Sequence, residues 1–233
     1  MRSVSVAPGF RAGISLASEG DMGLLRSAAN RVRFLRLLDI DPDHAFGLRQ
    51  VHSRRLVSVD GRSAAELAGI EADGMIASEA SAVLTVTVAD CLPIFLVDRR
   101  IGAFSLVHSG WRGTGVALNA VCAMVRDCGS RPADLAVTIG PGIGTCCYRV
   151  PDDRAADFAR EFGVETVTAG SDGQPRLDLR RANVRLLERE GVGTITVMEE
   201  CTCCSSALGS FRRQGAIAYT LMMAFLGAAV GGL

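Results

Sequence analysis

Lysine is absent from this sequence, and all 25 of its basic residues are arginine. This absence excludes a Schiff-base lysine and the lysine of a Walker A phosphate loop. Histidine is scarce, with three residues, and aromatic residues make up only 5% of the chain. The 25 acidic residues balance the arginines, so the formal net charge is zero. Because nucleic-acid binding depends on a broad positive charge, we expect no nucleic-acid partner.

An export signal is also missing. The first residues, MRSVSVAPGFRAG, contain no continuous apolar segment of the secretory type. We therefore expect a cytoplasmic protein whose eight cysteines are free thiols. The segment 215–233 carries no charge and approaches the length of a membrane span. Its glycine and alanine content favours a core strand or helix, so membrane binding is not expected.

Hydrophobic residues make up 48% of the 233 positions, which is enough for one sizeable core. No linker or repeat divides the chain, so we predict a single domain, 1–233. Apolar alternation between turn residues predicts strands at 55–60, 74–78, 82–90, 93–98, 102–109, 135–140 and 193–200. Helical spacing predicts helices at 21–40 with Asp21 as N-cap, 114–128 with Thr114 as N-cap, 151–163 and 177–191. This order favours a mixed α/β fold with layered sheets.

Three reactive side chains stand near the ends of predicted strands. Cys91 follows Asp90 after VLTVTVAD, His108 follows AFSLV, and His52 lies in RQVHSRRL, just before a strand. If these ends converge, two imidazoles and one thiolate form a three-ligand set with an open fourth position, as in catalytic zinc sites. The separations along the chain are too long for a zinc finger. Two alternatives therefore stay open, a Cys91–His108 nucleophile pair and ordinary core packing.

Further cysteines offer a second candidate site. The segment ECTCC supplies Cys201, Cys203 and Cys204, and GTCCYRV supplies Cys146 and Cys147. Together they provide the thiols for a structural four-thiolate site, and Cys201 and Cys204 have the two-residue spacer of a zinc knuckle. The adjacent pair in GTCCYRV does not supply a matching second half.

An arginine-glycine pair marks a candidate anion site. Arg112 and Gly113 stand just before the predicted helix 114–128, where helix N-terminal amides and a guanidinium suit an anion. A surface salt bridge is the alternative role for Arg112. The loop IGPGIG, with Gly140 and Pro141, either lets the backbone approach a ligand or turns the chain.

Five motifs follow one another along the chain: RQVH, EADGMI, VADCLPIFLVD, VHSGWRG and IGPGIGTCCYRV. In this order they resemble the YfiH-type laccase-domain family, also described as the polyphenol oxidase or peptidoglycan-editing-factor family. The likeness continues through LDLRRANVRLLEREGV and SFRR and covers nearly the whole chain. The family's HAGWRG is HSGWRG here, with Ser109, and ECTCC adds Cys203 and Cys204 to the family pattern.

The resemblance implies a fold, a metal and an activity. The fold is a single layered α/β/β/α domain with mixed sheets. The metal is zinc bound by His52, Cys91 and His108, with copper as the alternative. The activity is that of a purine nucleoside phosphorylase acting on adenosine, inosine and methylthioadenosine, with adenosine deaminase activity. A copper-dependent polyphenol oxidase and a peptidoglycan-precursor editing amidase or quality-control protein are the alternatives.

Roles for individual residues follow from this resemblance. Three histidines are too few for a multicopper centre, so the purine reaction is favoured over oxidation. Zinc deaminases carry Glu two residues after a histidine ligand, and neither His52 nor His108 does. We therefore expect Asp90 or Asp73 to transfer protons, and Arg112 to clamp phosphate.

The remaining substrate contacts and partners are predicted in the same way. Gly113, Gly140 and Pro141 are expected to bind substrate beside Arg112. Purine nucleosides and phosphate are the expected partners. We expect a monomer or a weak homodimer.

Overall fold

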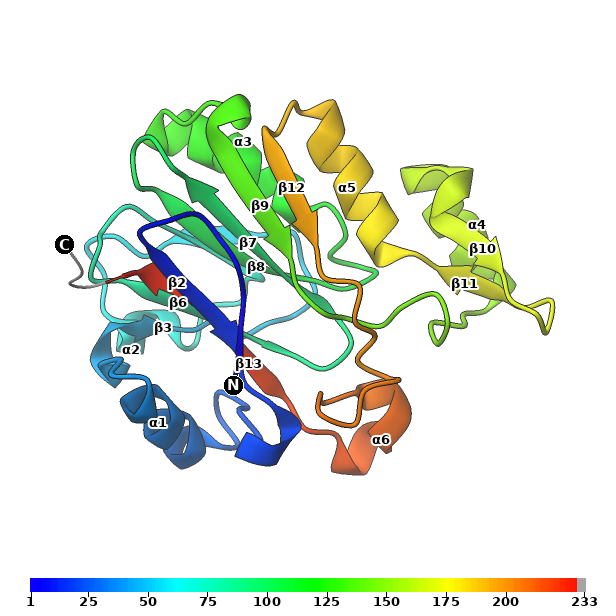
Figure 1. The fold of residues 1–233 in the computed structure, drawn as a ribbon, viewed down its shortest axis with the longest axis horizontal. Coiled ribbons are helices and arrows are strands. Elements are labelled where there is room, and N and C mark those ends of the chain that lie inside the picture. The colour runs from blue at the N-terminus through cyan, green and yellow to red at the C-terminus, as the bar shows by residue number, and fades with distance from the viewer. Residues whose placement is uncertain (230–233) are drawn as a thin grey trace.

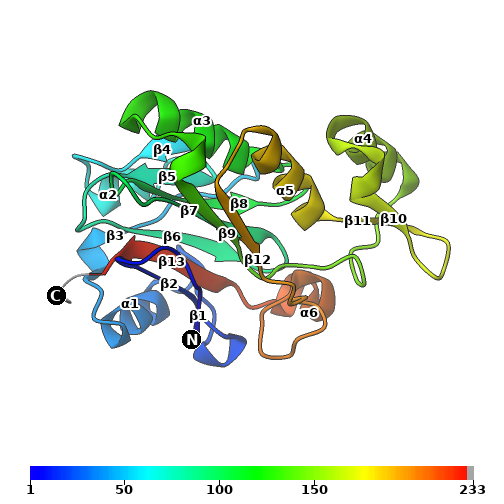
Figure 2. The same ribbon diagram turned by 45° about the horizontal axis from the view of Figure 1, so that its top comes forward.

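Two stacked sheets form the centre of the computed structural model, which describes residues 1–229 (Figures 1 and 2). The five-stranded sheet has the order β1 (Arg2–Ser3), β2 (Phe10–Ile14), β13 (Met222–Ala228), β6 (Val83–Val88) and β3 (Ala45–Phe46). The six-stranded sheet has the order β12 (Thr194–Val197), β9 (Leu135–Ile139), β7 (Leu92–Asp98), β8 (Phe104–Ser109), β5 (Gly74–Ala77) and β4 (Leu56–Ser58). Both sheets contain parallel and antiparallel pairs, as predicted for a mixed α/β fold.

Strand β7 shows why its sequence is apolar without interruption. All seven of its residues are buried, because both faces of the sheet are covered. Phe95 and Val97 pack into the core between the two sheets. Ile94 and Leu96 point to the opposite face and pack against helices.

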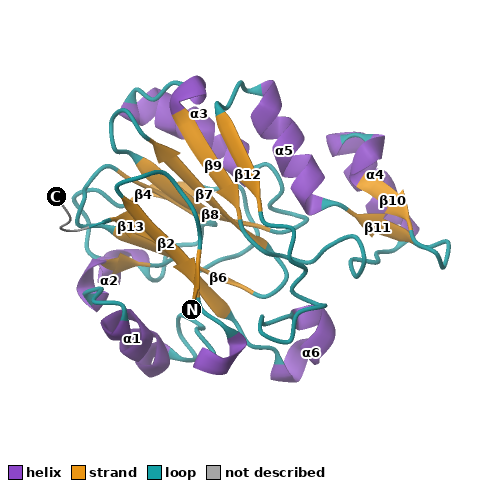
Figure 3. Ribbon diagram, viewed as in Figure 1, coloured by secondary structure: helices purple, strands orange, loops and turns teal. Residues whose placement is uncertain are grey.

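Helices cover the two outer faces (Figure 3). The six-stranded sheet is covered by α3 (Val116–Cys128) and α5 (Leu179–Arg189), with α4 (Asp152–Phe162) packed farther along. The five-stranded sheet is covered by α1 (Ala28–Leu37). The short elements are α2 (Ala64–Leu67), α6 (Phe211–Ala218), β10 (Val167–Ala169) and β11 (Pro175–Leu177). The layers are therefore α/β/β/α, as the family resemblance implied.

Two predicted helix starts are wrong. The predicted helix 21–40 begins only at Ala28, because the Asp21 carboxylate binds the Arg26 guanidinium and the Leu221 amide instead of capping a first turn. These bonds hold residues 21–27 in turns against the C-terminal strand. The second helix begins at Val116, after Gly115.

Thr114 is not the N-cap of α3, because the Thr114 hydroxyl donates to the Gly110 carbonyl.

Part of the apolar C-terminal segment belongs to the core, whereas residues 215–218, at the end of α6, are exposed. Strand β13 lies between β2 and β6 and pairs with both, and its residues from Met222 to Leu226 are buried. Within residues 1–229, no helix is both long enough and apolar enough to cross a membrane. Residues 230–233, which end the predicted segment 215–233, lie outside the described residues.

Candidate metal centre

Strand pairing brings three chain segments together where three neighbouring strands of the six-stranded sheet begin or end. Strand β8 lies antiparallel between β5 and β7, and His108 at its end is paired with Pro93 at the start of β7. Cys91 directly precedes β7, and Asp73 directly precedes β5. The end of one strand and the starts of its two neighbours therefore place these side chains together.

The structure brings together the three predicted metal ligands. The ligand atoms of His52, Cys91 and His108 all lie within 4.8 Å of one another. The two imidazole rings meet edge to face, with their centroids 4.9 Å apart. His108 is buried, Cys91 is partly buried and His52 is exposed, so one side of the group faces solvent.

The Asp73 carboxylate positions two of these ligands. It accepts hydrogen bonds from the backbone amides of Val51, His52 and Ser53, and it lies 2.8 Å from His108 Nδ1. With Nδ1 bound to the carboxylate, His108 Nε2 is left free to bind a metal. Asp73 is fully buried and does not line the cavity described below. Its position is that of a residue behind the ligands, rather than of the proton-transfer group predicted from sequence.

Charge at the centre is concentrated on Cys91 and His108. Burial opposes ionisation of both groups, but the neighbouring imidazoles hold the pKa of the Cys91 thiol below its usual range. The Cys91 thiolate and the Asp73 carboxylate in turn raise the pKa of His108 despite its burial. These opposite shifts favour a thiolate beside an imidazolium in the centre without metal, and a metal cation would replace the imidazolium proton.

Unusual backbone conformations surround the centre. His52 and Asp90 are two of the three non-glycine residues with positive φ within residues 1–229, at 60° and 89°. Such conformations cost free energy and persist only where surrounding contacts enforce them. Gly110 permits a close approach, because a Cβ there would lie 2.7 Å from Cys91 Sγ.

Asp90 is placed between the metal ligands and a long loop. Its carboxylate accepts a 2.6 Å hydrogen bond from the Thr202 hydroxyl and a 2.7 Å hydrogen bond from the Arg212 amide. Asp90 also lines the cavity beside the ligands. The structure thus places this predicted proton-transfer residue within the site.

A cavity of about 510 Å³ opens over the three ligands. This volume lies within the range of small-molecule sites, about 300–1,000 Å³. Aromatic rings form much of its wall: Trp111, Tyr148, Phe211 and Tyr219. Its polar lining includes Gln50, Arg154 and Arg212.

The two cavity arginines differ in how they are held. Arg154 lies over the Trp111 ring at 4.5 Å from its centroid, and its guanidinium makes no hydrogen bond or ion pair with any residue in 1–229. The Arg212 guanidinium instead donates to the backbone carbonyls of Cys147 and Arg149. Arg154 therefore has donors available for a ligand, whereas those of Arg212 are partly used.

The remaining predicted substrate contacts lie outside the cavity lining. Arg112 is exposed, and its guanidinium lies 5.0 Å from the Trp111 ring centroid. Gly113 is buried against the Ser53 carbonyl. The Gly140 amide donates to the Pro93 carbonyl, and Pro141 beside it is buried. The loop IGPGIG thus turns the chain against the start of β7.

The donor set is suited to a metal. Two imidazole nitrogens and one thiolate are ligands that zinc and copper both accept, and three protein ligands leave a position for a substrate or water. The third histidine, His44, is remote from the group and pairs with Asp41 on the surface at 3.1 Å. The donors of this centre thus fit one metal ion, and the described residues provide no further imidazole for a multinuclear copper centre.

The fold and this centre define a layered α/β protein with a group of two histidines and one cysteine, suited to a metal ion, next to a small-molecule cavity. Residues 17–227 match the sequence model of a family described as multi-copper polyphenol oxidoreductase laccase. The chain belongs to this family.

Similar proteins carry names from purine chemistry. The chain is 39% identical over 163 residues to purine nucleoside phosphorylase YlmD of Geobacillus stearothermophilus, an alignment that covers 66% of this chain and 59% of that protein. It is 33% identical over 204 residues to a purine nucleoside phosphorylase of Deinococcus radiodurans, covering 86% of this chain and 77% of that protein. The first alignment thus spans under two thirds of its relative's length.

Two solved structures superpose on almost the whole of this chain. The structure of Bacillus licheniformis YfiH superposes with a TM-score of 0.86 at 30% identity, covering 94% of this chain and 93% of that chain. The structure of YlmD superposes with a TM-score of 0.84 at 32% identity, covering 95% and 94%. These likenesses confirm the predicted fold and the predicted family.

Several cavity residues were not found from sequence. Arg154, Arg212, Tyr148, Phe211 and Tyr219 come from α4, from α6 and from loops distant along the chain. None lies in a motif with a chemical signature of its own. The available signals were two segments within the resemblance, SFRR with Phe211 and Arg212, and IGPGIGTCCYRV with Tyr148.

Proposed function

We propose that this chain is a zinc-dependent purine nucleoside phosphorylase. The observation that carries the proposal is the three-ligand centre at the base of a cavity with aromatic walls and a free arginine. The names of the relatives support the same reaction class. Adenosine, inosine and methylthioadenosine are the proposed substrates, and adenosine deamination is proposed as a second reaction.

Aromatic rings suit the purine. Tyr148, Phe211 and Tyr219 line the cavity with apolar surface against which a flat heterocycle can pack, which excludes water from the bound nucleoside. Gln50 already uses its side-chain oxygen and nitrogen on Thr87, so it shapes the wall more than it binds ligand. Recognition of the nucleoside therefore depends mainly on stacking.

Arg154 is the proposed phosphate contact. Its guanidinium lies at the cavity, is oriented by Trp111, and has no partner among residues 1–229. A planar guanidinium can donate two parallel hydrogen bonds to one phosphate. Arg112, which the sequence favoured for this role, is the alternative to be tested against it.

His52, Cys91 and His108 would hold the zinc ion, with Asp73 orienting His108. A zinc ion bound there supplies Lewis-acid activation next to the substrate. Asp90 is the proposed proton-transfer group, since it is the one carboxylate among the described residues that line the cavity. The Thr202 hydroxyl and the Arg212 amide fix its orientation.

The test is a product analysis. Purified protein of known metal content is incubated with adenosine and phosphate, and the products are separated by chromatography. Adenine with ribose 1-phosphate reports phosphorolysis, and inosine reports deamination. Cys91→Ala, which removes one ligand, should abolish both. No turnover by the zinc-loaded parent would contradict the proposal and favour a binding function.

A further inference from the structure

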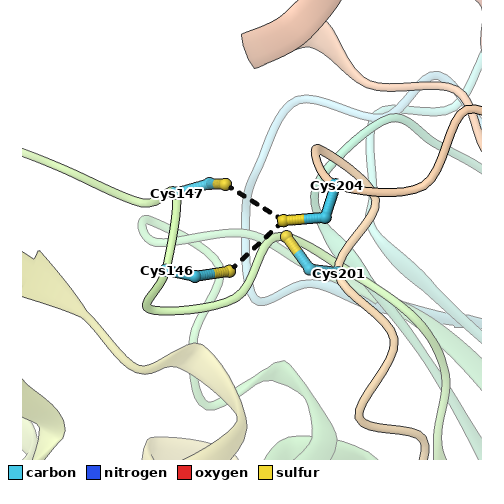
Figure 4. A group of neighbouring side chains, drawn as sticks. All are labelled: Cys146, Cys147, Cys201 and Cys204. Carbon is cyan, nitrogen blue, oxygen red and sulfur yellow. Dashed lines mark hydrogen bonds between the residues drawn. The ribbon is translucent and has the colours of Figure 1, made fainter.

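A second group of thiols lies on two loops, one between β9 and α4 and one between β12 and α6 (Figure 4). All four sulfur atoms lie within 4.8 Å of one another. None of them belongs to the centre described above. We call this group the four-thiol cluster, and its members are Cys146, Cys147, Cys201 and Cys204.

The sheet explains how distant segments form this cluster. Strands β9 and β12 are parallel neighbours, so both loops leave the same edge of the sheet. The loops stay together beyond the strands, because the Thr202 amide donates to the Gly142 carbonyl at 3.1 Å. Each loop contributes two thiols. The sequence offered these four cysteines together with Cys203 as a candidate four-thiolate site, and the structure shows that Cys203 is not part of the group.

The sulfur separations match a single tetrahedral ion. Cys204 Sγ lies 3.6 Å from Cys146 Sγ and 3.5 Å from Cys147 Sγ. A disulfide requires about 2.0 Å. Zinc–sulfur bonds of about 2.3 Å in tetrahedral geometry place neighbouring thiolates about 3.8 Å apart. A cluster of several irons needs its thiolates spread around a larger core.

We propose that the four-thiol cluster binds one structural zinc ion as a tetrathiolate site. Four thiolates close the coordination sphere, which distinguishes this site from the three-ligand centre. The two sites share no ligand, so each can be present without the other.

Positive charge surrounds the loops that carry the thiols. A zinc ion with four thiolates has a net negative charge, which nearby cations and hydrogen-bond donors stabilise. Three arginine side chains donate to backbone carbonyls of the two loops: Arg176, Arg212 and Arg213. The Gly144 amide donates directly to Cys201 Sγ at 3.2 Å. These donors and cations would therefore stabilise an anionic metal complex at the cluster.

Zinc in this site would fix one wall of the cavity. Tyr148 follows Cys147 directly and lines the cavity. Thr202 follows Cys201 directly, and its hydroxyl holds Asp90. The ion would thus link two loops whose next residues shape the substrate cavity.

Zinc content of purified, reduced full-length protein tests the proposal. Cys204 is exposed, so Cys204→Ser leaves no core cavity. We expect this substitution to lower zinc by about one ion per chain, both in the parent and in Cys91→Ala. Using both backgrounds separates this site from the His52–Cys91–His108 centre.

Cys122→Ser is the matched control, because Cys122 is also an exposed thiol but lies on α3. It should leave the zinc content unchanged. Cobalt added to metal-free Cys91→Ala should give the intense thiolate-to-cobalt absorption of a tetrathiolate site, and Cys204→Ser should remove it. Unchanged zinc after Cys204→Ser, iron in place of zinc, or a Cys146–Cys204 disulfide in reduced protein would overturn the proposal.

Discussion

At the scale of single residues, the geometry of the metal centre depends on a glycine, which has no side chain, and on a buried carboxylate. Gly110 follows the strand that carries His108, and its lack of a side chain lets His52 and Cys91 approach. Asp73 connects the backbone of one ligand to the ring of another. Neither residue is a metal ligand, yet both determine where the ligands lie.

Gly110→Ala should weaken zinc binding at this centre by about tenfold or more, with the fold retained. The added Cβ would lie 2.7 Å from Cys91 Sγ and 3.1 Å from His52 Cδ2, so the ligands must move apart. Titration against a competing chelator measures the change. Gly69→Ala is the control, because a Cβ there meets no atom within 4 Å. Equal affinities for Gly110→Ala and the parent would contradict this explanation.

Asp73 should make the metal-free protein sensitive to acid. Burial acts to raise the pKa of Asp73, but hydrogen bonds from His108 and Ser53 lower it to about 2. A carboxylate whose pKa is lower in the folded state stabilises the fold above the unfolded pKa of about 4, and loses this effect as the pH falls towards 2.

The measurement is the free energy of unfolding against pH for the parent and for Asp73→Asn. The variant should be less stable near neutral pH, and the difference should shrink between about pH 4 and pH 2. A difference that stays constant over this range would show that the Asp73 charge is not the cause.

At the scale of elements, helices and loops beyond the sheets supply the cavity wall. Helix α4 carries Arg154 in its first turn and places it over Trp111, which follows β8. Helix α6 begins with Phe211 and Arg212. The ligands come from strand ends, whereas the substrate wall comes from these outer elements.

Arg154→Gln should raise the KM for phosphate by about tenfold or more, and the KM for adenosine much less, because a charged bidentate donor is lost. Arg112→Gln is the matched comparison, since Arg112 also lies near Trp111 but outside the cavity lining. Steady-state kinetics with each substrate varied separate the two residues. A larger phosphate effect in Arg112→Gln would restore the role predicted from sequence.

At the scale of the whole molecule, both outer helical layers pack on sheets that share one inner core. Phe95 of β7 and Leu226 of β13 both belong to the core between the sheets. Strand β13 joins the end of the described chain to its beginning through β2. One domain over 1–233 stays a prediction. A monomer or weak homodimer stays a prediction.

Calorimetry of the zinc-loaded chain should show one unfolding transition, because the two sheets cannot separate without exposing the core between them. Phe225→Ala, which empties a buried position between β13 and α1, should lower the free energy of unfolding by about 3–5 kcal/mol. It should shift that single transition without splitting it. Two resolved transitions would show that the sheets unfold as separate domains.

The sequence alone determined the features that are local along the chain. The apolar segment 93–98 predicted a strand, which lies within β7, and the predicted helix 114–128 ends at Cys128, as α3 does. Ordered motifs around His52, Cys91 and His108 predicted the family and the ligand set through resemblance. Local patterns succeed here because strand burial and helix ends depend on neighbouring residues.

Only the tertiary structure decided what depends on contacts between distant segments. Asp21 binds the Leu221 amide instead of capping a helix, and Arg154 instead of Arg112 lines the cavity. The four-thiol cluster forms because β9 and β12 run parallel, which no spacing within one segment could reveal. The physical reason is common to all three: each side chain's partner is set by strand pairing and packing across the fold, and not by its neighbours in sequence.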